Sequence, residues 1–319
     1  MRLVPEIETN THSGLQTALL TSKFGMMPDE ALAAFRQHKN SESLNLCGIH
    51  LHIGSQNPNA SPYAEAFEML FANLVQIRNE TGIRLSHINL GGGFPVNYLR
   101  DPSMESQFPT EQREMFTADF EPADALRTAW NAVKQAANSA NAVHLLENLT
   151  LLLEPGRSVI SDAGICLTTV RNKKDRPVTQ PATTDSHQPA TDNWLLTDAG
   201  FNILLSMETY KWYYHLISAE RPDEAATNPY KLAGPLCDGG DVYFDIEGQN
   251  RLPDHRLLPE NVQPGEVLAL LNCGAYTLAQ ASQYNGRFLP AMVLIRKNGE
   301  AELIRKRDVF EDLISNDIW

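Results

Sequence analysis

The first half of the chain alternates between short apolar runs and longer segments with apolar residues at helical spacing. The apolar runs predict strands, and a spacing of about 3.6 residues predicts amphipathic helices. The helices are expected at 28–38, 63–81 and 119–140, and the strands at 46–55, 85–90 and 150–153. This alternation predicts parallel strands joined by crossover helices. A long loop rich in proline and acidic residues is expected at 100–118.

After Arg157 the pattern changes, because helical spacing fades and short β-type runs take its place. These runs are expected as strands at 159–170, 194–197, 241–244, 267–271 and 291–295. The polar, proline-containing stretch at 170–192 is expected to be an exposed excursion. We therefore expect an α/β domain at 1–158 and a β-rich domain at 159–319.

The last strand of the first half leads directly into Glu154, Pro155, Gly156 and Arg157. Its continuous apolar run predicts a parallel strand that is buried on both faces. Charged groups directly after such a strand lie at the C-terminal rim of the sheet, where the active sites of α/β barrels are found. A surface Glu/Arg pair at a strand end would have the same sequence. This motif alone therefore leaves open whether these residues form a functional site or only an exposed polar strand end.

Two other strand ends carry candidate chemistry. Gly91, Gly92 and Gly93 follow the 85–90 strand and could bring backbone N–H groups close to a phosphate. His52 and Ser55 follow the 46–55 run and offer a flat ring and a hydroxyl group at the same rim. A tight turn and a buried structural histidine are the alternatives, and each is the more common case for a single motif.

The second half carries a thiol and two acids in Cys237-Asp238-Gly239-Gly240-Asp241, which could also be an ordinary polar turn. Gly274-Ala275-Tyr276 could likewise be a plain strand end. None of these motifs is decisive by itself.

The charge and the cysteine content argue against several classes of protein. The net charge of −13 argues against a nucleic-acid or anionic-membrane surface. No apolar run approaches the roughly 20 residues that a membrane span needs. The first residues lack the apolar core of a signal peptide. Four widely spaced cysteines without a CxxC pair indicate reduced thiols and no metal site, so a cytoplasmic location is expected.

Taken together and in order, the motifs resemble the ornithine/diaminopimelate/arginine decarboxylase family of pyridoxal-phosphate enzymes. The motifs are HIGSQ, NLGGGFP, LEPGR, DAGFN, GPLCDGGD and GAYTLAQASQYNGR. The resemblance runs from about residue 2 to about residue 310. It implies the second half of a (β/α)8 barrel followed by a C-terminal β-rich sandwich or barrel domain.

The resemblance implies roles for individual residues. His52 would stack on the pyridine ring, and Glu154 would face the ring nitrogen and keep it protonated. Cys237 would be a proton donor near the substrate's α-carbon, and Asp238 would pair with a distal ammonium. These two residues would act in the partner subunit's site, so a homodimer is expected. The phosphate would be held by Ser55, Gly91, Gly92, Gly93, Gly156, Arg157 and Tyr276.

One departure from the family is the lysine that holds the cofactor as a Schiff base, in a motif resembling YAVKAN. None of the nine lysines stands in such a motif. The segment before the β-rich domain is also shorter than the roughly 250 residues of a complete barrel. We therefore expect a chain that begins in mid-barrel: a truncated reading frame, a fragment completed by another chain, or a cofactor-free paralogue.

A second departure concerns the substrate. Diaminopimelate decarboxylases carry an arginine-proline pair that grips a distal carboxylate, and Ser206 and Met207 stand there instead. Tyr210 matches a family tyrosine, and Glu208 could supply a second acid beside Asp238. The preferred substrate is a basic amino acid or a diamino-acid derivative.

Two functions other than decarboxylation are compatible with parts of this pattern. A catalytically inactive homologue that binds a regulatory partner, comparable to the antizyme-inhibitor proteins, is the alternative to decarboxylation. An alanine-racemase-like enzyme is disfavoured because such racemases place an arginine, where Glu154 stands here, at the pyridine nitrogen.

Overall fold

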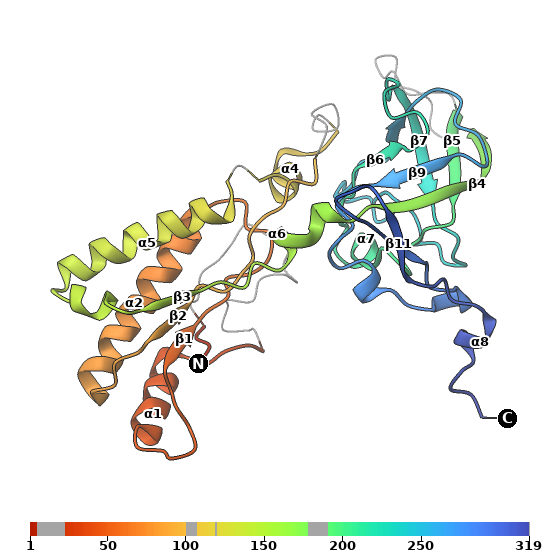
Figure 1. The fold of residues 1–319 in the computed structure, drawn as a ribbon. Helices are drawn as coiled ribbons and strands as arrows, with labels where there is room; N and C mark the ends of the chain where they lie inside the picture. Colours follow the sequence, from red (N-terminus) through yellow and green to blue (C-terminus); the bar gives the residue numbers. More distant parts are fainter. Residues whose placement is uncertain (5–22, 100–106, 119, 178–190, 319) are drawn as a thin grey trace. The chain divides into compact units, whose positions relative to one another are not determined.

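The fold is known from a computed structural model that describes residues 1–4, 23–99, 107–118, 120–177 and 191–318. The chain divides into two compact units. Unit 1 consists of residues 1–99 and 110–161, and unit 2 consists of residues 100–109 and 162–319. Figure 1 shows the elements of each unit, which are described separately below.

A parallel sheet forms the centre of unit 1. Its strands are β1 (Gly48–His50), β2 (His87–Asn89) and β3 (Thr150–Leu152), in that order. Ile49, Ile88 and Leu151 are in register across the sheet. The predicted parallel arrangement with crossover helices is confirmed.

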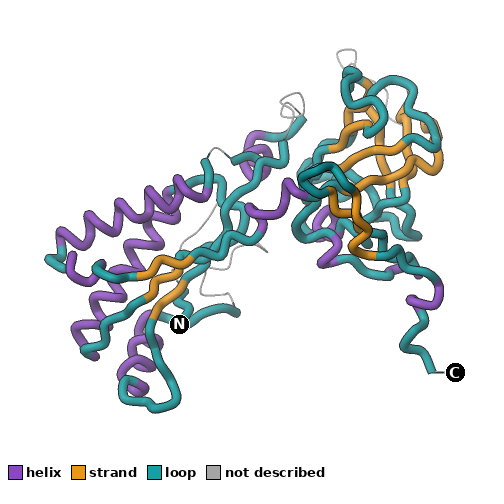
Figure 2. The backbone as a smooth tube through the Cα atoms, in the orientation of Figure 1, coloured by secondary structure: helices purple, strands orange, loops and turns teal. Residues whose placement is uncertain are grey.

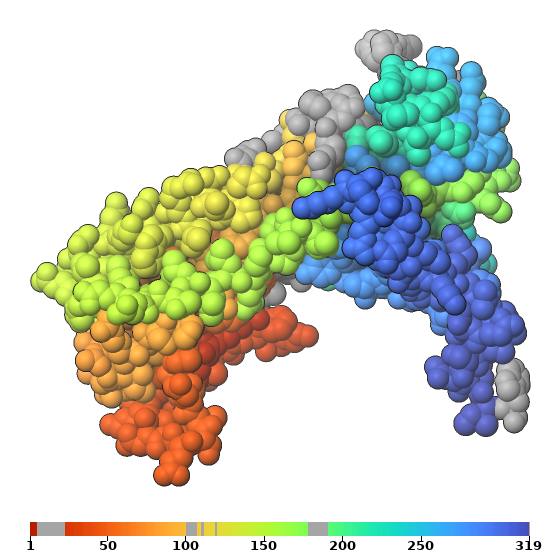
Figure 3. All heavy atoms as spheres, in the orientation of Figure 1, coloured from red at the N-terminus to blue at the C-terminus, as the bar shows by residue number. Residues whose placement is uncertain are grey.

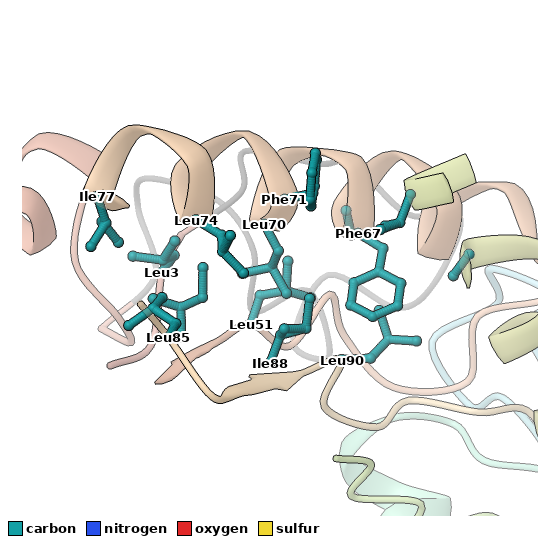
Figure 4. Close-up of a cluster of buried hydrophobic side chains, with 14 of the residues drawn as sticks. Leu3, Leu51, Phe67, Leu70, Phe71, Leu74, Ile77, Leu85, Ile88 and Leu90 are labelled. Carbon is teal, nitrogen blue, oxygen red and sulfur yellow. The ribbon is translucent and has the colours of Figure 1, made fainter. Parts of the chain in front are cut away.

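Three long helices accompany these strands: α1 (Pro28–His38), α2 (Ser61–Thr81) and α5 (Pro122–Ser139). Helix α2 ends at Gly82, which has a φ of 78° and donates its N–H to the carbonyl of Arg78. The apolar side of α2 packs on one face of the sheet, as Figure 4 shows for Leu70 above Leu51 and Ile88 and for Phe67 beside Leu90. This cluster is the core of unit 1.

The predicted loop at 100–118 contains a short helix, α4 (Thr110–Phe116), while 100–106 lies outside the described residues. The helix follows Pro109 and contains glutamate, glutamine and arginine, which favour helix. A 3₁₀ turn, η2 (Val143–Leu146), precedes β3.

The prediction that β3 is buried on both faces is wrong in this structure. Leu152 is 41% exposed, and Thr150 is exposed as well. Strand β3 lies at the edge of the sheet, and only its Leu151 side packs against the apolar cluster. An apolar run by itself does not show how many faces are covered.

The segment after Glu154 also differs from the prediction. Residues 159–163 were expected to begin a strand, but α6 (Arg157–Ile160) and η3 (Ser161–Ala163) occupy this region. Pro155 and Gly156, the latter with a φ of 50°, turn the chain before it enters α6.

Unit 2 is rich in β structure, as the strands in Figure 2 show. Six strands form one sheet in the order β6-β9-β4-β5-β7-β8. Their bounds are β4 (Cys166–Pro177), β5 (Thr191–Thr197), β6 (Leu216–Ser218), β7 (Asn228–Ala233), β8 (Arg256–Leu258) and β9 (Val267–Leu270). A short helix, α7 (Leu205–Thr209), lies between β5 and β6.

The rest of unit 2 is the C-terminal part of the chain. An antiparallel pair is formed by β10 (Met292–Ile295) and β11 (Ala301–Arg305), both largely exposed at the surface (Figure 3, dark blue). The 3₁₀ turns η4 (Leu278–Gln280) and η5 (Tyr284–Gly286) precede this pair, and α8 (Phe310–Leu313) follows it.

Two predictions in unit 2 need correction. The ends of the 170–192 excursion are paired strand, because β4 continues to Pro177 and β5 begins at Thr191. Residues 178–190 lie outside the described part of the chain. Residues 241–244 form no full strand: Val242 makes a single antiparallel bridge with Ala233 of β7, and the carboxylate of Asp241 bonds to the N–H groups of Phe201 and Leu236.

Among the described residues, no helix combines the length and apolar character needed to cross a lipid bilayer.

Candidate cofactor site

The carboxyl ends of β1, β2 and β3 bring the sequence motifs of unit 1 together. Backbone hydrogen bonds continue past the strand ends, from the N–H of Leu51 to the carbonyl of Asn89 and from the N–H of Leu90 to the carbonyl of Leu152. The N–H of Glu154 then donates to the carbonyl of Gly91 over 2.7 Å. The predicted groups after the three strands therefore share one rim.

Gly91, Gly92 and Gly93, here called the glycine run, have no room for side chains. A Cβ on Gly92 would overlap the carbonyl oxygen of Glu154, and one on Gly93 would overlap that of Gly54. Gly91 and Gly93 also have φ values of 71° and 87°, which L-residues rarely adopt. The glycine run therefore lies directly against the neighbouring strand ends.

His52 is tied to the glycine run, because its Nδ1 accepts the N–H of Gly92 over 3.1 Å. The pKa of His52 is lowered to about 4, chiefly by burial and also by the nearby charges of Arg2 and His50, which outweigh the opposing effect of Glu154. The ring is therefore neutral near pH 7. Since Nδ1 is an acceptor, the ring proton is on Nε2.

The carboxylate of Glu154 points toward polar neighbours on the same sheet face. Asn89 donates its Nδ2 hydrogen to Oε1 over 2.8 Å, and the Nε2 atom of His50 lies 3.7 Å from Oε2. The Glu154 side chain is still 55% exposed. It is an oriented acid that can accept a hydrogen bond from a ligand.

Arg157 is buried at the start of α6. Its Nη1 donates to the hydroxyl of Tyr98 over 3.0 Å, and that hydroxyl lies 2.9 Å from Oγ of Ser161. Ser55 is half-buried after Gly54. The contacts above bring His52, the glycine run and Glu154 together, while Arg157 is fixed by Tyr98 beside Gly156.

Three residues of this site were not predicted from the sequence: Arg2, His50 and Asn89. His50 precedes His52 by two residues, and Asn89 precedes Gly91 by two. On an extended chain, residues two apart face the same side, so this spacing could have identified His50 and Asn89, while the sequence offers no such signal for Arg2.

The second group of predicted residues lies in unit 2. Cys237 is exposed, and its backbone N–H donates to Oδ1 of Asn285 over 2.7 Å. The carboxylate of Asp238 accepts the hydroxyl hydrogen of Tyr284 over 3.1 Å and the N–H of Gly240 over 2.9 Å. Among the described residues, Asp238 forms no salt bridge with a lysine or arginine.

Glu208 lies beside this loop, since a Cβ on Gly240 would be 3.2 Å from its Oε1. Its Oε2 is 2.9 Å from the Nζ of Lys211, a lysine that is only 4% exposed. Tyr210 follows α7 and is half-buried. Glu208 therefore lies beside the loop that carries Asp238. Its negative charge is paired with the positive charge of Lys211.

Tyr276 lies in unit 2 with a φ of 56° and is 43% exposed. Its predicted contact with a phosphate stays a prediction, as do the roles assigned to Ser55, Gly156 and Arg157.

Comparison with known proteins identifies the family. Residues 1–161 match the family model of the pyridoxal-dependent decarboxylases, pyridoxal binding domain. The diaminopimelate decarboxylases of Methanocaldococcus jannaschii and Bacillus subtilis are 32% and 30% identical to the chain over 99% and 100% of its length. The chain spans 62% and 63% of these two relatives.

Solved structures agree with the sequence relatives. Diaminopimelate decarboxylase from Helicobacter pylori in complex with L-lysine has a TM-score of 0.75 at 26% identity, covering 98% of this chain and 65% of that one. The M. jannaschii enzyme with L-lysine has a TM-score of 0.75 at 30% identity, covering 100% and 63%. The resemblance seen in the motifs is confirmed, and the chain belongs to the pyridoxal-dependent decarboxylase family.

Proposed function

We propose that the chain binds pyridoxal 5'-phosphate on unit 1 and serves the decarboxylation of an amino acid that carries a distal ammonium group. The observation that carries this proposal is the assembly of His52, the glycine run and Glu154 at one rim of the sheet. Family membership supplies the cofactor class.

The residues of unit 1 fit the parts of this cofactor. The Glu154 carboxylate suits a protonated pyridine nitrogen, and the neutral ring of His52 suits the flat face of the pyridine. The glycine run, where any side chain would overlap a neighbouring strand end, is assigned to the phosphate, with Ser55, Gly156 and Arg157 as further ligands from unit 1. When bound, the cofactor withdraws electrons from the α-carbon as carbon dioxide leaves.

Unit 2 supplies the groups that would act on the substrate. Asp238 keeps an unmatched negative charge, so it suits a distal ammonium. Cys237 is exposed and would donate the proton to the α-carbon, while Glu208 and Tyr210 line the substrate's distal end.

The substrate class follows from these charges and from one substitution. The relatives described above are named diaminopimelate decarboxylases, and two are solved with L-lysine. Ser206 and Met207 lack the charge needed to grip a distal carboxylate. A basic amino acid or a diamino-acid derivative therefore suits the site best.

We further propose that unit 1 is the second half of a (β/α)8 barrel and that unit 2 is a β-sandwich or β-barrel domain, with the boundary near 158. In the active form, Cys237 and Asp238 of one protomer would serve the site of its partner. A homodimer in the cytoplasm is the expected state.

One observation favours a second candidate, a catalytically inactive homologue that binds a partner protein. Strands β1, β2 and β3 contain no lysine, so they offer no amine for covalent attachment of the cofactor. We therefore expect that borohydride treatment of the chain with stoichiometric pyridoxal phosphate labels no single lysine above the level of the others. Preferential labelling of one lysine, detected by mass spectrometry of the peptides, would contradict this expectation.

A decarboxylation assay decides between the two candidates. Purified chain, pyridoxal phosphate and either L-lysine, L-ornithine or meso-diaminopimelate are incubated, and carbon dioxide is measured against pyridoxal phosphate alone. Release faster than in the cofactor control, with L-lysine or L-ornithine preferred, supports the proposal. Release equal to that control overturns decarboxylation and leaves the inactive homologue.

The role of Asp238 is tested in the same assay. Asp238→Asn should raise KM for the preferred substrate by roughly tenfold while kcat changes less, because a hydrogen bond to a charged group is lost. Asp254→Asn, at an exposed position elsewhere in unit 2, is the control. An unchanged KM in the Asp238 variant would show that the distal ammonium binds elsewhere.

A further inference from the structure

Asn89, at the end of β2, uses both ends of its side-chain amide. Its Nδ2 donates to Oε1 of Glu154 over 2.8 Å, and its Oδ1 accepts the N–H of Gly91 over 2.8 Å. The opposite amide orientation would place an oxygen against a carboxylate and an NH₂ group against an N–H. The hydrogen-bond network therefore fixes the orientation that is described.

This amide connects the side chain of Glu154 to the glycine run. The backbone of Glu154 is held by its N–H bond to Gly91, but its side chain is 55% exposed. The second carboxylate oxygen is 3.7 Å from His50, beyond hydrogen-bond distance. Asn89 is thus the side chain whose hydrogen bond orients the carboxylate.

We propose that Asn89 is a positioning residue that directs Glu154 at the pyridine nitrogen of bound pyridoxal phosphate and braces the glycine run under the phosphate. This inference rests on the proposed function. An oriented acceptor loses less rotational freedom when the ligand binds, so it binds the ring nitrogen more tightly.

Two substitutions separate the two hydrogen bonds. Asn89→Asp keeps an acceptor for the N–H of Gly91, but it removes the donor to Glu154 and places a like charge beside that carboxylate. Asn89→Ala removes both bonds. Asn131→Asp, on the exposed side of α5, makes the same charge change in unit 1 away from the site and is the control.

The measurement is the dissociation constant of pyridoxal phosphate and of its 1-deaza analogue, in which a C–H group replaces the ring nitrogen. Binding is followed by protein fluorescence, and circular dichroism confirms folding of each variant. The ratio of the two constants isolates the contribution of the ring nitrogen. In the wild-type chain and in Asn131→Asp, we expect pyridoxal phosphate to bind roughly tenfold more tightly than the analogue.

In Asn89→Asp this preference should fall to near onefold while the analogue still binds. Asn89→Ala should lose the preference and weaken the analogue as well, because the brace under the glycine run is gone. If both compounds weaken equally in Asn89→Asp, or neither does, the positioning role is overturned and the cofactor site stands. If the wild-type chain binds neither compound, the proposed function and this inference are both overturned.

Discussion

At the scale of single residues, the protonation state of His52 makes a direct prediction about pH. Burial lowers its folded-state pKa from 6.5 to about 4. Between these values the unfolded chain takes up a proton that the folded chain does not, so the free energy of unfolding falls as the pH falls from about 6.5 to about 4. The His52 contribution to this loss is about 3 kcal/mol.

Urea unfolding of the wild-type chain and of His52→Gln at pH 4, 5, 6 and 7 checks this prediction. The difference in unfolding free energy between the two proteins should change with pH over this window and level off below about pH 4. Titratable groups that do not interact with His52 affect both proteins alike. A difference that is independent of pH would mean that His52 is not a buried neutral histidine.

The sequence identified the residues proposed to contact the cofactor, but not the neighbouring residues that hold them in place. Glu154, His52 and the glycine run are recognisable because their residue types stand in ordered motifs. Asn89 and His50 are ordinary polar residues of strand ends, and their importance depends on what lies across the sheet. Such neighbours depend on strand register, which local sequence does not specify.

At the scale of elements, the glycine run predicts a contrast between two glycine substitutions. Gly93 has a φ of 87°, and its Cβ would overlap the carbonyl oxygen of Gly54. Gly82, at the end of α2, has a φ of 78° with nothing within 4 Å. Gly93→Ala should therefore destabilise the chain by several kcal/mol, and Gly82→Ala by only about 1 kcal/mol.

Thermal unfolding and urea titration of the two alanine variants give these free energies. Both substitutions carry the penalty of a positive φ, so their difference isolates the missing space at Gly93. Equal destabilisation by the two substitutions would show that the glycine run is not packed against the strand end.

The long helices of this chain were predicted well, whereas the short helices α4, α6 and α7 and the burial of β3 were not. Helix α2 could be assigned from its spacing and its terminal glycine, both of which are local signals. The burial of β3 could not, because an apolar run looks the same at the edge of a sheet as at its centre. At 241–244, the buried carboxylate of Asp241 bonds to the backbone of Phe201 and Leu236, and these partners are defined only by the fold.

At the scale of the whole molecule, the family resemblance predicts a homodimer. Its mass would be twice the 35.5 kDa of one chain. Size-exclusion chromatography with light scattering at micromolar concentration measures this mass directly. A monomer under these conditions would remove the proposed exchange of Cys237 and Asp238 between protomers.

The change from alternating helices and strands to mostly strands could be predicted because the period of the apolar pattern changes near Arg157. The strand order of unit 2 could not be predicted, since β6 and β8 have only three residues each and pair with strands that are distant in sequence. Pairings of this kind are set by tertiary packing.

The most direct test of the central claim is the affinity of the chain for pyridoxal phosphate with and without the Glu154 carboxylate. Glu154→Gln keeps the size of the side chain, and Glu147→Gln, which removes an exposed carboxylate elsewhere in unit 1, is the control. We predict that Glu154→Gln weakens binding by roughly tenfold or more and that Glu147→Gln leaves it unchanged. Equal affinities for wild type and Glu154→Gln would contradict the assignment of Glu154 to the pyridine nitrogen.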